Sequence, residues 1–143
     1  MRLRLSFLVV ISLGLILVLW ACESVVRISI VDEAAPTFEF KGSGYVDLFM
    51  VVEAEPNQEP KSFGDKSRVL WEIFPDTTKT GTLPVPLITY GKVPPGFHQT
   101  IPEKGPPAPL KEGATYQAGA PPFAHRFGFI VFKVQGRKIV ALD

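Results

Sequence analysis

The fold is indicated most clearly by the C-terminal residues 127–142, Phe127-Gly-Phe-Ile-Val-Phe-Lys-Val-Gln-Gly-Arg-Lys-Ile-Val-Ala-Leu142. Along the first half of this stretch, successive side chains fall on two different faces. This period of two predicts a β-strand. One face holds Phe127, Phe129, Val131 and Lys133, and the other holds Gly128, Ile130, Phe132 and Val134. Gln135-Gly136-Arg137 predicts a turn, and residues 139–142 predict the returning partner strand. The chain is therefore expected to end in a β-hairpin.

Further strands are expected upstream of this hairpin, separated by turns rich in proline and glycine. Their ranges are 26–30, an apolar patch at 38–40, 45–52, 69–74, 86–90 (at a sheet edge, given its flanking prolines) and 114–118. All 14 prolines lie after residue 21, and proline at this density breaks long helices. Seven or eight short strands predict an all-β sandwich of immunoglobulin or fibronectin type III style. A small closed barrel is the alternative.

The expected core of this domain is aromatic. Trp71, Tyr90 and the phenylalanines of the C-terminal strand are its predicted members. In the strand at 69–74, alternation predicts Val69, Trp71 and Ile73 on one face, with Leu70, Glu72 and Phe74 on the other.

Composition restricts the classes of function. The chain has 143 residues, and 15 Lys+Arg against 14 Asp+Glu give a formal net charge of +1. This balance excludes a nucleic-acid binder that works through bulk basicity, and 46% hydrophobic residues exclude an acidic disordered tail. The single cysteine excludes a disulfide framework and any metal site built from several cysteines. No nucleic-acid partner is expected.

The N-terminus has the pattern of an export signal. Arg2 and Arg4 are followed by an uncharged, mostly apolar run over residues 5–21, slightly short for a stable membrane span. This run ends in Leu19-Trp20-Ala21-Cys22, which resembles the lipobox of bacterial lipoproteins. The alternative is an uncleaved membrane helix that carries a periplasmic domain.

The lipobox resemblance implies cleavage between Ala21 and Cys22 and lipidation of Cys22. Residues 1–21, expected to be a signal helix, are then the signal peptide, and residues 22–143 form a single β-sandwich domain. The membrane is the expected partner, contacted through acyl chains at the new N-terminus. Glu23 follows the cysteine where an aspartate retains lipoproteins at the inner membrane. The resemblance therefore favours the periplasmic face of the outer membrane, with the inner membrane as the alternative.

A proline-rich segment over residues 84–109 is the most individual part of the chain. With its flanks it contains Tyr90-Gly91, Val93-Pro94, Gly96-Phe97 and Pro109-Leu110. Over residues 69–116 this pattern resembles small bacterial lipoproteins of unknown function, so it implies no activity.

The proline-rich segment has two interpretations. It is either a stiff display loop, in which Tyr90, Pro94, Pro95 and Phe97 contact an envelope protein, peptide or glycan, or a connection between strands that covers Tyr90 and Phe97. Exposed Phe97 and Tyr116 would favour the loop, and buried ones the connection.

Candidate catalytic groups are few. His98 and His125 are the only imidazoles, and a metal site would pair them with a carboxylate such as Glu103. They lie in separate proline-rich loops without ligand spacing, so no catalytic residue, metal or cofactor is expected. The predicted function is a lipid-anchored binding or structural module of the cell envelope. An enzyme would need a histidine–carboxylate cluster in a pocket.

Overall fold

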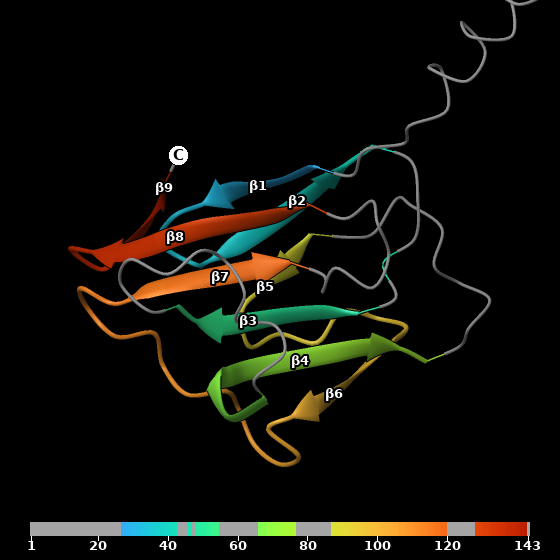
Figure 1. The fold of residues 1–143 in the computed structure, drawn as a ribbon. Coiled ribbons are helices and arrows are strands. Elements are labelled where there is room, and N and C mark those ends of the chain that lie inside the picture. The colour runs from blue at the N-terminus through green and yellow to red at the C-terminus, as the bar shows by residue number, and fades with distance from the viewer. Residues whose placement is uncertain are drawn as a thin grey trace, which may run out of the picture.

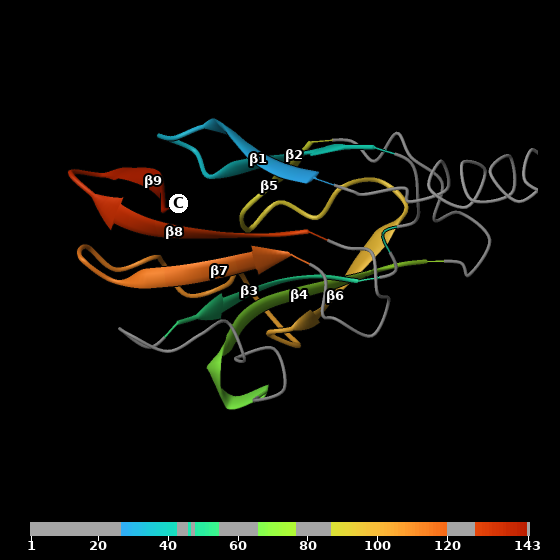
Figure 2. The same ribbon diagram turned by 45° about the horizontal axis from the view of Figure 1, so that its top comes forward.

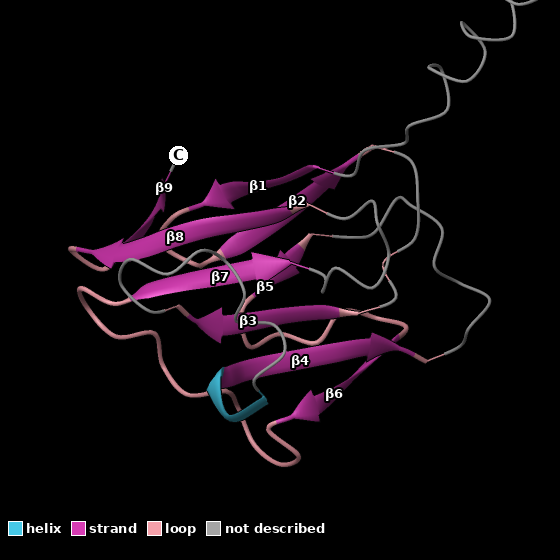
Figure 3. Ribbon diagram, in the orientation of Figure 1, coloured by secondary structure: helices cyan, strands magenta, loops and turns pink. Residues whose placement is uncertain are grey.

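A computed structural model describes residues 27–42, 46, 48–54, 66–76, 87–119 and 128–142. These residues form two antiparallel β-sheets, of three and six strands, packed face to face (Figures 1 and 2). The helical content of the described part is one short 3-10 turn, Lys66–Arg68 (Figure 3). The predicted all-β, two-layered fold is thus confirmed.

The smaller sheet has the strand order β1-β2-β5. Its strands are β1 (Arg27–Asp32), β2 (Thr37–Lys41) and β5 (Ile88–Thr89). The Asp32 carboxylate accepts hydrogen bonds from the backbone N–H groups of Ala34 and Ala35, which fixes the tight turn between β1 and β2. β5 lies at the edge of this sheet, as its flanking prolines predict.

The larger sheet has the strand order β6-β4-β3-β7-β8-β9. Its strands are β3 (Phe49–Glu53), β4 (Val69–Pro75), β6 (Phe97–Ile101), β7 (Thr115–Gly119), β8 (Phe129–Gln135) and β9 (Lys138–Leu142). The described residues therefore hold nine strands, where the sequence predicts seven or eight. The missed strand is β6, because the polar run at its centre lies among prolines.

The C-terminal hairpin forms as predicted, with Gln135 paired to Lys138 across the turn. Gly136 and Arg137 both have positive φ, 60° and 67°, which is the backbone of a type I′ turn. The expected core of C-terminal phenylalanines is only partly correct. Phe132 is fully buried, whereas Phe129 is 49% exposed because alternation turns it to the outer face.

The core between the sheets is largely aromatic. Trp71 is fully buried, and its ring lies 5.9 Å from Phe49 and 5.6 Å from Tyr90, edge to face in both pairs. Phe38 bridges the two sheets, at 5.4 Å from Phe49 and 5.6 Å from Phe132. Of the two predicted core residues outside the hairpin, Trp71 is central and Tyr90 is half-buried beside it.

The prediction for the faces of β4 is wrong at its first two residues. Val51 pairs with Trp71 but Val52 pairs with Val69, so Leu70 is the extra residue of a β-bulge. The bulge turns Val69 to the outer face, where it packs on Met50, while Leu70 packs against the main core.

The outer face of the larger sheet is also buried at its centre. Glu72 on β4 is 4% exposed, and its Oε1 accepts a hydrogen bond of 2.7 Å from the hydroxyl of Thr100. Gln117 on β7 is fully buried, and its amide has no hydrogen-bond partner among the described residues. Gln117 is therefore a weak point of this face, because a buried amide without partners destabilises the fold.

Replacing Gln117 with methionine is expected to raise the free energy of unfolding by about 1–2 kcal/mol, because the volume is kept and the unpaired amide removed. The matched control is Gln99→Met. The Gln99 amide accepts from the Trp71 indole and donates to the carbonyls of Pro102 and Gly105, so this variant should be destabilised. Urea titration followed by circular dichroism measures both. A destabilised Gln117→Met variant would contradict the interpretation.

Candidate functional site

The residues of the predicted lipidation site, Ala21 and Cys22, lie outside the described residues, as does His125. Among the described residues no helix is long and apolar enough to span a membrane.

The four residues of the predicted contact loop do not form one surface. Pro94 is buried, Pro95 is exposed, and Tyr90 and Phe97 are partly buried against the main core. Tyr116 is fully buried, and its hydroxyl accepts a hydrogen bond from the Lys111 backbone N–H. Buried aromatic rings are what the connection interpretation expects. Partner binding by this loop stays a prediction.

The core itself holds the proline-rich segment in place. The Gln99 side chain, fixed by the indole of Trp71 at 2.9 Å, donates to the carbonyls of Pro102 and Gly105 at 2.6 and 2.9 Å. The Tyr90 hydroxyl donates to the carbonyl of Ala108 at 2.7 Å. Residues 102–108 of the segment are therefore held against the sandwich.

Burial also determines the charge of Tyr90. Desolvation raises the pKa of its hydroxyl well above the usual range, and the neighbouring Tyr116 adds to the shift. The Tyr90 hydroxyl therefore stays protonated even at strongly alkaline pH. Its ring can serve as an apolar wall, with the hydroxyl already engaged by the backbone.

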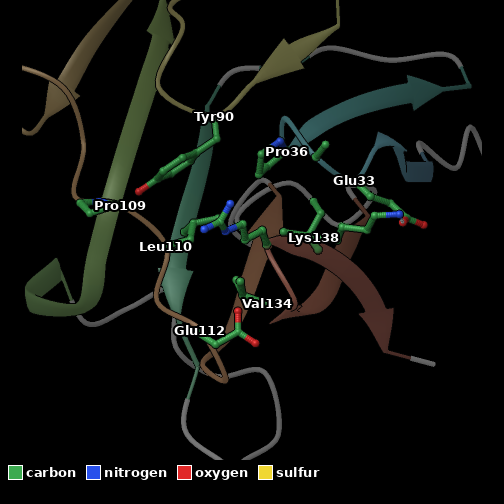
Figure 4. Close-up of a pocket in the computed structure, with 11 residues that line it drawn as sticks. Glu33, Pro36, Tyr90, Pro109, Leu110, Glu112, Val134 and Lys138 are labelled. Carbon is green, nitrogen blue, oxygen red and sulfur yellow. Dashed lines mark ion pairs between the residues drawn. The ribbon is translucent and has the colours of Figure 1, made fainter.

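One face of this wall lines a pocket of about 400 Å³ (Figure 4). The pocket lies at one end of the sandwich, between the β1–β2 turn, Tyr90, residues 109–112 and the β8–β9 hairpin. Its apolar lining comes from Ala34, Pro36, Tyr90, Pro109, Leu110, Val134 and Ile139. A volume near the lower end of the range for small-molecule sites fits a small ligand.

Four charged residues line the same pocket. Lys138 Nζ lies 3.9 Å from a carboxylate oxygen of Glu33, the ion pair drawn in Figure 4. The Glu112 carboxylate accepts a hydrogen bond of 2.9 Å from the Gly136 backbone N–H, which fixes it to the hairpin turn. The Arg137 side chain has no ion-pair or hydrogen-bond partner within the described ranges.

A histidine–carboxylate pair lies away from this pocket. His98 Nδ1 is 3.0 Å from Asp76 Oδ1, and the imidazole stacks on the ring of Phe74 at 6.2 Å. Both partners are about half exposed, and in the part of the chain that the structure describes, no group of three or more potential metal ligands occurs. The enzyme alternative needs such a pair inside a pocket, and this one does not line the pocket described above.

Sequence reasoning found Tyr90 but missed the rest of the pocket, because its lining comes from four separate segments. Arg137 was assigned only to a turn. The available signal was a long cationic side chain next to glycine in a two-residue turn, where glycine or asparagine is the usual choice.

No family model matches the chain, and neither a curated protein nor a solved structure matches it.

Proposed function

We propose that the protein is an exported module, anchored by lipid on Cys22, that binds or supports other molecules at the bacterial cell envelope. The Leu19-Trp20-Ala21-Cys22 motif after a basic and then apolar N-terminus carries this proposal. Cleavage after Ala21 would place the lipidated cysteine only a few residues before β1. Each buried acyl CH₂ contributes about 0.8 kcal/mol, so two or more acyl chains hold a domain firmly at a bilayer.

The proposal also includes the family, the signal helix and the membrane that the sequence predicts. It places the protein with the small bacterial lipoproteins that residues 69–116 resemble, after a cleaved signal helix. It favours the periplasmic face of the outer membrane, with the inner membrane as the alternative. An uncleaved membrane helix would leave the same domain in the periplasm.

We also propose that the sandwich is of immunoglobulin or fibronectin type III style. The support is the strand order, because β1-β2-β5 and β3-β7-β8 follow the A-B-E and C-F-G orders of that class. In this comparison β4 and β6 extend the larger sheet beyond strand C, and β9 extends it beyond strand G.

The pocket supports a binding role more than a purely structural one, because a scaffold alone needs no apolar cavity lined by a cation, Arg137, that has no partner in the described part of the chain. Glycan or peptide binding by the proline-rich segment is the alternative. The observation that favours it is exposed apolar surface at Val93, 42% exposed, beside the exposed Pro95.

Labelled palmitate supplied to growing bacteria tests the anchor. The wild-type chain is expected to incorporate label and to fractionate with membranes. Cys22→Ala should lose all label, because the acyl acceptor is removed, whereas the neighbouring change Ser24→Ala should keep it. Equal label in the wild-type and Cys22→Ala chains would refute the proposed anchor.

A further inference from the structure

We infer that the pocket at the end of the sandwich binds a small carboxylate with an apolar chain, the chain lying in the pocket and the carboxylate on Arg137. This inference deepens the proposed binding role and rests on it, but it does not depend on the lipid anchor.

The apolar part of the ligand is determined by the lining. The Tyr90 ring and Leu110 line the pocket from one side (Figure 4). Val134 and Ile139, both buried, also belong to its lining. The Tyr90 hydroxyl already donates its proton to the Ala108 carbonyl, so it is not free to donate to a ligand. Apolar surface buried here is removed from water, which favours an aliphatic chain.

The charge expected at the polar end of the ligand follows from the four charged side chains that line the pocket, and from which of them already have partners. Glu33 pairs with Lys138, and the Glu112 carboxylate is held by the Gly136 N–H. The rim is formally neutral, yet Arg137 alone lacks a partner among the described residues. A guanidinium presents parallel N–H donors that match a carboxylate. The guanidinium donors of Arg137, which have no partner among the described residues, therefore favour an anionic acceptor at this point.

The backbone of Arg137 is a second, independent observation. It is the one non-glycine residue with positive φ in the described part of the chain. An L-residue with a long side chain rarely adopts this conformation, and such strain is characteristic of functional positions. A turn selected only for stability would place asparagine or glycine here. An arginine at this position therefore fits a role for its side chain at the pocket.

Equilibrium dialysis of radiolabelled octanoate tests this inference. The full chain, purified from membranes into phosphatidylcholine nanodiscs, is compared with empty nanodiscs. We expect one saturable site per chain. Arg137→Asn should weaken octanoate binding roughly tenfold or more, the scale of a lost charge-assisted contact, and Arg137→Lys should retain part of it. Octanol, with the same chain and no carboxylate, should bind at least about tenfold more weakly.

Two controls keep the test decisive. Arg27→Asn removes the same charge from the exposed start of β1, outside the pocket, and should bind octanoate like the wild type. Asparagine tolerates the left-handed turn, so Arg137→Asn should melt no lower than the wild type. Absence of saturable octanoate binding, equal binding by Arg137→Asn, or octanol binding as tight as octanoate would each overturn the inference. Palmitate labelling that persists in such a case would leave the anchor standing.

Discussion

Replacing Trp71 with alanine is expected to lower the free energy of unfolding by about 3–5 kcal/mol, the cost of truncating a large aromatic side chain in a packed core. Trp71 is fully buried at the centre of the sandwich and touches the rings of Phe49 and Tyr90. Its indole N–H also holds the Gln99 amide, which would lose one partner. Because small domains are stable by only about 5–15 kcal/mol, this single change would remove a large share of the total.

Urea unfolding followed by circular dichroism measures the effect of Trp71→Ala as a lower midpoint with an unchanged slope. The matched control is Phe129→Ala, an aromatic truncation on the outer face of β8, where the ring is 49% exposed. It should cost under about 1 kcal/mol. Equal losses at the two positions would mean that Trp71 does not lie at the centre of the core.

Replacing Gly119 with alanine is expected to cost about 2–4 kcal/mol, from close contact and an unfavourable backbone together. A Cβ atom at Gly119 would lie 2.7 Å from the Gly128 carbonyl oxygen and 2.9 Å from the Phe129 Cα. These are backbone atoms at and just before the start of the neighbouring strand β8, so they cannot move aside as a flexible side chain would. The φ of +154° is also one that glycine adopts far more readily than alanine.

Gly113→Ala separates the two causes. Gly113 has a φ of +77°, but a Cβ atom there would meet nothing within 4 Å. Its substitution should cost only about 1 kcal/mol of backbone strain. Thermal unfolding of both variants gives the comparison. If Gly119→Ala is no less stable than Gly113→Ala, this result would contradict the close approach of β7 and β8 at Gly119.

The sequence predicts the parts of the fold that depend on local periodicity. The hairpin of β8 and β9, the edge position of β5 and the central place of Trp71 follow from alternation and from prolines, which act over a few residues. Tyr90 could be expected near the core because a large aromatic residue ends a predicted strand.

The features that the sequence does not predict depend on contacts between distant segments. The bulge at Leu70 is visible only in the pairing with β3. Strand β6 is half-buried and polar, and it is stabilised by pairing with β4. The pocket is assembled from four segments, so no local pattern indicates it. Arg137 becomes distinctive only once its φ and its lack of a partner within the described residues are known.

The proposed lipid anchor and the proposed ligand site lie in separate parts of this protein. The lipobox-like motif lies at residues 19–22, whereas the pocket is built from residues 33–36, Tyr90, 109–112 and 134–139. A variant without the lipid should therefore keep its pocket, and a variant of Arg137 should keep its lipid. This independence allows each claim to be tested while the other serves as its control.

The central claim, that a lipid on Cys22 holds the sandwich at a membrane, is tested most directly by the mass of the chain extracted from bacterial membranes. We expect a polypeptide that begins at Cys22 and carries acyl chains on that residue. A chain with residues 1–21 still attached, or one that begins at Cys22 without acyl chains, would contradict the claim.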